Sequence, residues 1–174
     1  DGTTEMPAGH FTRAVDLVAL ARLRTDWSIG VAAHPEGHPK ASSPADDIEH
    51  HAQKLAAADF AITQFFFRVE HYERFVAAMA KRGVRTPVIA GIMPPTNVEG
   101  IGRMAAQNGT EYPREIVARL EAAGDDVDAR RAVATEEATR LGEALLAAGA
   151  PGLHLYTMNF SEPARTIARN LGLA

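Results

Sequence analysis

Residues 27–33 are Trp27-Ser28-Ile29-Gly30-Val31-Ala32-Ala33, a short apolar run with β-branched residues at its centre. Such a run is typical of a strand buried on both faces. A loop rich in His, Pro and Gly follows, and Ser43-Pro44-Ala45-Asp46 then places serine at a helix N-cap and proline at the first helical position. The stretch therefore predicts a strand, a loop and a helix that runs to about Ala57.

The same strand-then-helix pattern recurs along the chain. Further apolar runs predict strands at Phe60–Phe66, Pro87–Ile92 and Gly152–Thr157. Helical spacing of apolar residues predicts the other helices, at about 11–24, 70–82, 97–107, 113–122, 126–148 and 162–170. Strands alternating with helices indicate an α/β fold with a parallel sheet, and we expect the four strands to be neighbours in chain order.

Four strands leave two architectures open. A complete (β/α)8 barrel needs eight strands and about 250 residues. The chain has 174 residues. The sheet is therefore either open or one half of a barrel, and in both cases its two outer strands would expose their edges.

Composition narrows the class of protein. The chain carries 18 Lys+Arg against 22 Asp+Glu, a net charge of −4, and 46% hydrophobic residues. This balance supports one packed domain and argues against a nucleic-acid or anionic-membrane surface. The chain has no cysteine, which excludes disulfides and thiolate sites and favours a reducing, cytoplasmic setting. Neither a membrane span nor a signal peptide is expected, since residues 1–5 are Asp1-Gly2-Thr3-Thr4-Glu5.

Polar residues gather where the predicted strands end, which is where α/β proteins place their reactive groups. His34 and His38 lie in the loop after the first strand, among prolines and a glycine, so their spacing has no metal-binding geometry and no metal site is expected. They either make turn contacts or donate to ligand oxygens. Asp46, Asp47, His50, His51 and Lys54 follow on the next helix, where the simplest interpretation is a solvated face.

Gln64 is the most informative single residue because it is an amide inside an apolar strand. Burying it without partners would cost about 1–3 kcal/mol. Its amide either bonds the backbone of a neighbouring strand or meets the edge of a planar heterocycle that offers a donor and an acceptor. The three phenylalanines that follow, 65–67, are expected to pack in the core.

Five segments, in this order and spacing, resemble the flavin-dependent 5,10-methylenetetrahydrofolate reductases. The segments are Ala14-Val15-Asp16-Leu17-Val18, Ile29-Gly30-Val31-Ala32-Ala33-His34-Pro35-Glu36-Gly37-His38-Pro39, Ala61-Ile62-Thr63-Gln64-Phe65-Phe66, Gly91-Ile92-Met93-Pro94-Pro95-Thr96-Asn97 and Gly152-Leu153-His154-Leu155-Tyr156-Thr157-Met158-Asn159. The resemblance implies a (β/α)8 TIM barrel that binds FAD. Residues 1–174 would then be the C-terminal portion of that single domain, with roughly the last four strands and their helices.

The resemblance also implies a set of cofactor-binding residues for FAD. They are Ala14, His34, His38, Ala41, Asp47, His50, Gln53 and Lys54. The family often has Tyr at His34, Asn at His50 and Arg at Gln53, so an aromatic stack and a phosphate-pairing cation are replaced here. We therefore expect FAD to be required but bound more weakly than in typical relatives.

The implied substrate-binding residues are Gln64, which would bond the pterin or the nicotinamide, Met104 beside the folate, and Tyr156. Phe160 and Gly100 stand where the family has an arginine and a polar residue, so the folate glutamate tail would be held differently. No catalytic acid is expected within this chain, since the family's proton donor belongs to the first half of the barrel.

The function implied is reduction of 5,10-methylenetetrahydrofolate to 5-methyltetrahydrofolate by NADH or NADPH through FAD, in one-carbon metabolism and methionine supply. The expected partners are these small molecules and possible further copies of the chain. The fragment alone would be inactive. The alternative is a non-catalytic folate- or flavin-binding partner subunit of a redox complex.

Overall fold

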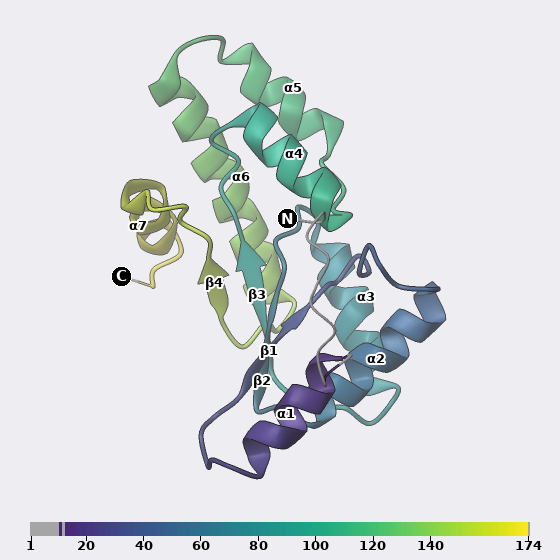
Figure 1. Ribbon diagram of the computed structural model, residues 1–174. Coiled ribbons are helices and arrows are strands. Elements are labelled where there is room, and N and C mark those ends of the chain that lie inside the picture. Colours follow the sequence, from purple (N-terminus) through teal and green to yellow (C-terminus); the bar gives the residue numbers. More distant parts are fainter. Residues whose placement is uncertain (1–10, 12, 174) are drawn as a thin grey trace.

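The computed structural model describes residues 11 and 13–173, and it contains a four-stranded parallel sheet (Figure 1). The strands are β1 (Gly30–Ala33), β2 (Phe60–Thr63), β3 (Val88–Ile92) and β4 (Leu153–Leu155), in the order β1-β2-β3-β4. Gly30 pairs with Phe60, and Ala90 pairs with Leu153. The predicted parallel order is therefore confirmed, and β1 and β4 form the two edges of the sheet. The signal-peptide prediction on 1–5 lies outside the described residues.

Seven helices are described, and six of them connect or follow the strands as predicted. They are α1 (Ala14–Arg22), α2 (Pro44–Ala56), α3 (Val69–Ala80), α4 (Val98–Asn108), α5 (Arg114–Ala122), α6 (Val127–Ala147) and α7 (Ser161–Asn170). The Ser43 side chain caps α2 by accepting from the Asp46 backbone N–H. Gly109 ends α4 in the left-handed conformation, with φ of 68°.

The core lies between one face of the sheet and the helices. Alternate residues of β3, at Val88, Ala90 and Ile92, belong to one buried cluster. Leu55 of α2, Phe75 of α3, Leu145 of α6 and Ile167 of α7 complete this cluster from the helix side. The period of two residues along each strand therefore assigns one face to the core.

The prediction that the strand at 27–33 is buried on both faces is wrong. Ala33 is fully buried against the helices, but Gly30 and Ala32, whose positions alternate with it, are exposed. Phe60, Ile62, Ile89 and His154 lie at the corresponding positions of the other strands and are only partly buried. No described helix covers this second face of the sheet.

The strands are shorter than the apolar runs, and side chains take part in the hydrogen bonds at their ends. The Asp59 carboxylate accepts from the Ile29 N–H at 2.7 Å, and the Asp59 N–H donates to the Ile29 carbonyl at 2.9 Å, just before β1 begins at Gly30. Trp27 lies outside the strand and is 73% exposed. At the other end, the Gln64 amide oxygen accepts from the Phe65 N–H at 3.0 Å. Phe65 and Phe66 are buried, as expected.

The loops after the strands converge at one end of the sheet, next to α4 and α5. Figure 1 shows these two helices beyond the tip of the β3 arrow. Within residues 13–173, no helix combines the length and apolar character that a membrane span requires.

Candidate functional site

The loop after β1 is held against α2 by a buried carboxylate. Asp47 is 5% exposed, and its Oδ2 accepts from the His38 N–H at 3.2 Å. Gly37 precedes His38 with φ of 98°, a conformation that favours glycine, and a Cβ there would lie 3.6 Å from Asp47 Oδ2. The loop therefore turns tightly around Asp47, which is not part of a solvated helix face.

His51 is a second buried link between α2 and this loop. Its Nδ1 donates to the Asp47 carbonyl at 2.9 Å, and its Nε2 accepts from the His34 N–H at 3.1 Å. A neutral imidazole has one donor and one acceptor, so both bonds are satisfied by a single tautomer. Burial lowers the pKa of His51, which agrees with a neutral ring. The solvated-face interpretation is wrong for His51, which is 2% exposed.

His34 packs between other imidazoles and leaves one nitrogen free. Its ring lies edge-on to His38, with centroids 4.7 Å apart, and 6.0 Å from His51. Its Nδ1 is buried with no hydrogen-bond partner among the described residues. Burial, reinforced by His38, His51 and Lys54, lowers the pKa of His34 to about 4. A neutral ring with a free buried nitrogen can meet a polar atom of a ligand.

A pocket of about 260 Å³ opens between the start of α1, the β1 loop and α2. It is lined by Arg13, Ala14, Val15, His38, Lys40, Ala41, Asp47, His50, His51, Gln53 and Lys54. Seven of the eight predicted cofactor residues therefore meet in one cavity. His34 does not line it, but contacts His38 at its wall.

The polar groups of this pocket suit an anionic ligand. Lys54 is partly buried, and burial lowers its pKa. His50 lies 3.4 Å from Asp46, and Gln53 donates to Glu49 at 3.2 Å, so both are engaged on the helix surface. Lys54 is the cation of α2 that lines the pocket and pairs with no carboxylate among the described residues.

Gln64 lies at the carboxyl end of β2, beside His34 rather than in the pocket. His34, Gln64, Phe65 and Thr110 line a narrow space there. The Gln64 backbone N–H donates to the Ala33 carbonyl at 2.7 Å, while the side-chain oxygen accepts from Phe65. Its Nε2 has no hydrogen bond to any described residue. The amide oxygen of Gln64 is therefore used by the next residue of the chain, while the two N–H donors of the amide stay available.

Tyr156 reaches across the sheet to β2. Its hydroxyl donates to the Thr63 carbonyl at 3.0 Å, and burial raises its pKa. Gly91 makes this crossing possible, because a Cβ there would lie 2.8 Å from the Tyr156 ring and 2.3 Å from the Thr63 oxygen. The Thr63 hydroxyl in turn accepts from the Gly91 N–H at 2.7 Å.

Met104 of α4 and Tyr156 pack against the same small cluster, which includes Phe65 and Met93. The three predicted substrate residues thus gather at one end of the sheet. His51 and Thr63 also take part in this candidate site, and neither is among the site residues predicted from the sequence. The spacing of His51 four residues after Asp47 was a signal for the first, since such pairs share a helix face.

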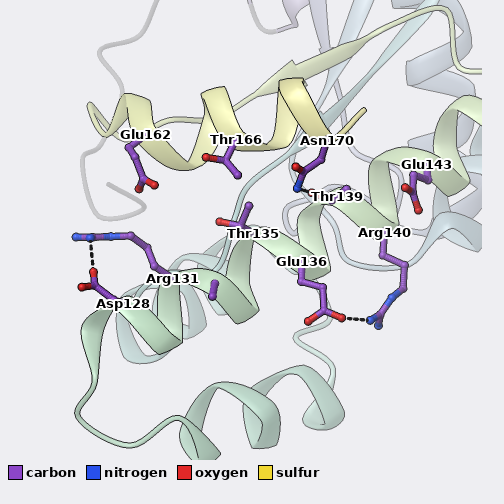
Figure 2. A pocket seen from close by; sticks show the side chains of 11 residues that line it. Asp128, Arg131, Thr135, Glu136, Thr139, Arg140, Glu143, Glu162, Thr166 and Asn170 are labelled. Carbon is purple, nitrogen blue, oxygen red and sulfur yellow. Dashed lines mark hydrogen bonds and ion pairs between the residues drawn. The ribbon is translucent and has the colours of Figure 1, made fainter. Parts of the chain in front are cut away.

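A second, larger groove of about 680 Å³ lies elsewhere, between α6 and α7 (Figure 2). Its arginines are already paired: Arg131 with Asp128 at 3.0 Å, and Arg140 with Glu136 at 2.8 Å. None of the sequence-predicted site residues lines it. This groove is therefore separate from the candidate site at the strand ends.

Comparison with known proteins shows which family the chain resembles. A sequence model of the family described as "Methylenetetrahydrofolate reductase" matches residues 1–172. The "Probable methylenetetrahydrofolate reductase (NADPH)" of Caenorhabditis elegans is 39% identical, and the match covers 98% of this chain and 26% of that protein. The "5,10-methylenetetrahydrofolate reductase" of Escherichia coli is 34% identical over 92% of this chain and 54% of that protein.

A further relative carries a different cofactor in its name. The "Probable methylenetetrahydrofolate reductase (NADH)" of Oryza sativa subsp. japonica is 36% identical, over 95% of this chain and 30% of that protein. The chain thus spans between a quarter and a little over half of the length of these three relatives.

Proposed function

The chain belongs to the methylenetetrahydrofolate reductase family, and from that premise we propose that it is part of an enzyme that reduces 5,10-methylenetetrahydrofolate to 5-methyltetrahydrofolate with NADH or NADPH. The observation that carries the proposal is the pocket at the β1 loop. It brings together seven of the eight residues that the resemblance selects for FAD, beside the strand end that bears Gln64.

The proposed architecture is a (β/α)8 barrel of which this chain contributes half. Two features support it: the sheet has helices on one face only, and its edge strands β1 and β4 lack outer neighbours among the described residues. The partly buried second face, with Phe60, Ile62 and Ile89, would then be the barrel interior.

The residues present fit FAD. Lys54 offers a cation at the pocket wall that no described carboxylate pairs with, and the neighbouring walls carry His38 and Arg13. A cavity of about 260 Å³ takes one end of such a large cofactor rather than all of it. When bound, FAD would accept the hydride of the nicotinamide and deliver it to the folate.

The chain's own residues would bind and orient the partners. Gln64 has free amide donors for a carbonyl of the pterin or the nicotinamide carboxamide, while Phe65 holds its oxygen in place. Met104 and Tyr156 would form an apolar wall that excludes water from one side. Holding two planar groups at reacting distance is the main contribution a protein makes to such a transfer. We place the proton donor outside this chain.

The test uses the complete protein that contains this chain. We expect purified protein to bind FAD and to oxidise NADH or NADPH only when 5,10-methylenetetrahydrofolate is supplied as acceptor, with 5-methyltetrahydrofolate as product. Product formation would be followed by chromatography, with FAD added in excess.

Two results would contradict the proposal. Turnover at full rate without any flavin would remove FAD from it. Protein that binds folate or flavin but reduces nothing, and that purifies in complex with another redox protein, would support a partner subunit instead.

A further inference from the structure

Three side chains from separate segments converge behind the β1 loop: Glu36 from that loop, His71 from α3 and Glu111 from the connection between α4 and α5. We call them the Glu36–His71–Glu111 cluster. One ligand atom from each lies within 4.8 Å of the other two. His71 Nε2 is 2.9 Å from Glu36 Oε1 and 3.3 Å from Glu111 Oε2.

Glu36 is buried and incompletely paired. Its side chain is 9% exposed; its Oε1 accepts from the Glu111 backbone N–H at 3.2 Å, whereas its Oε2 has no well-formed hydrogen bond among the described residues. The Thr110 hydroxyl lines the same space, donates to the Phe65 carbonyl at 3.3 Å, and is also close enough to Glu36 to lower the pKa of that carboxyl. A buried carboxylate oxygen without a well-placed donor is costly, so Oε2 keeps a lone pair that a cation could satisfy. Burial raises the pKa of Glu36, against the opposing effects of His71 and of the hydrogen bonds from Glu111 and Thr110.

The neighbouring cations do not fill this position. Arg68 pairs with Glu111 at 3.0 Å and with Glu115 at 2.7 Å, on the solvent side of the cluster. Arg74 lies 2.7 Å from His71 Nδ1 and donates to it. Both arginines are therefore engaged with partners other than Glu36.

We propose that the Glu36–His71–Glu111 cluster binds a divalent transition-metal cation, with zinc as the best fit. One imidazole nitrogen and two carboxylates are ligands that zinc accepts in sites with three protein ligands and a bound water. Tetrahedral ligands at zinc distances lie about 3.5 Å apart, close to the spacing already present around His71 Nε2.

The site would act on stability rather than on chemistry. It would connect the β1 loop, α3 and the α4–α5 connection, and Glu36 lies two residues before His38 of the cofactor pocket. A metal bound only by the folded state stabilises that state in proportion to its occupancy.

The test is titration of the complete, metal-stripped protein with zinc and with cobalt. We expect one equivalent of zinc to bind and to raise the melting temperature, and cobalt to give the visible absorption of a low-symmetry site. His71→Gln and Glu111→Gln should each weaken zinc binding by at least about tenfold, the loss common even for outer-shell partners of a metal. Glu111 is about half exposed, so its variant is expected to fold.

Arg74→Ala distinguishes a metal site from a plain ion-pair network. In the metal site His71 must present Nε2 as a lone pair and carry its proton on Nδ1, which conflicts with the Arg74 donor. Removing Arg74 should therefore tighten zinc binding. Arg82→Ala, which removes an arginine just after the opposite end of α3 that pairs with Glu49, is the matched control and should leave zinc binding unchanged.

Three results would overturn the proposal. The first is that no zinc binds at up to about 1 mM, which is already a weak affinity. The second is that wild type and both ligand variants bind zinc equally. The third is that Arg74→Ala binds zinc more weakly than wild type.

Discussion

Gly91 shows how one missing side chain organises the substrate end of the sheet. The Tyr156 ring lies over it, and the Tyr156 hydroxyl reaches the Thr63 carbonyl on the far side. The Gly91 N–H donates to the Thr63 hydroxyl rather than to a backbone carbonyl of the neighbouring strand. Two hydrogen bonds thus couple β2, β3 and the end of β4 at a point where a methyl group would collide with backbone.

Gln64→Glu should reduce folate turnover without unfolding the protein. The glutamate keeps an oxygen acceptor for the Phe65 N–H but loses the two amide donors that are free in the structure. We expect kcat/KM for the folate to fall roughly 10- to 1000-fold, the value of one to three lost hydrogen bonds. Melting temperature and kinetics would be measured on the complete enzyme with saturating flavin.

Gln64→Ala is the companion variant. It removes the acceptor as well, so it should lower both the melting temperature and kcat/KM. Unchanged folate kinetics in both variants would exclude Gln64 from the site.

His34 should make the protein less stable in mild acid. Its pKa is lowered to about 4 in the folded protein, from an ordinary value of 6.5. Between these values the unfolded chain binds more protons than the folded one, so stability decreases as pH falls from about 6.5 to 4. Urea unfolding midpoints at pH 7 and pH 5 should therefore differ more for wild type than for His34→Gln.

Burial lowers the pKa of His51 as well, so the His34→Gln variant should keep part of the acid sensitivity. If the urea unfolding midpoint depends on pH equally in wild type and in His34→Gln, His34 is not responsible for the acid sensitivity.

At the scale of elements, α2 connects the core to the pocket proposed to bind the cofactor. Its buried side carries Asp47, His51 and Leu55, and its N-terminus is capped by Ser43. The surface next to the pocket carries His50 and Gln53, where the family resemblance leads us to expect an asparagine and an arginine. One helix therefore determines both the position of the β1 loop and the charge presented to a ligand.

Gln53→Arg should tighten FAD binding by about tenfold, because a charge-assisted contact to phosphate is worth about 1.5 kcal/mol or more. Glu49 accepts from Gln53 and would compete for the new arginine, so Glu49→Gln combined with Gln53→Arg should bind FAD more tightly still. Flavin fluorescence titration of the complete protein measures both.

Lys54→Met changes the charge in the opposite direction and should weaken FAD binding. If wild type already retains FAD at submicromolar concentration through dialysis, the expectation of weak binding is wrong.

At the scale of the whole molecule, the sheet has two open edges and one uncovered face. β1 and β4 have no outer neighbours among the described residues, and Ala32 is exposed on the uncovered side. Unpaired strand edges associate with other chains. The 174-residue piece alone should therefore self-associate or unfold at low temperature. Sedimentation and thermal unfolding would check this, and a monomer that unfolds cooperatively would contradict it.

The sequence by itself determined the order and type of the elements. Strands are short apolar runs and helices have caps and a period of 3.6 residues, so local chemistry was sufficient to predict four parallel strands in chain order. Seven of the residues predicted to bind a cofactor, chosen through the family resemblance, line one pocket of the structure.

Only the tertiary structure decided which partners those residues have. The Ile29 N–H finds its acceptor in the Asp59 carboxylate, thirty residues away in sequence. The burial of His51 and the approach of Glu36, His71 and Glu111 depended on how α2, α3 and the α4–α5 connection pack. Such contacts join residues far apart in the chain, and local propensity carries no information about them because their energy exists only once the core has formed.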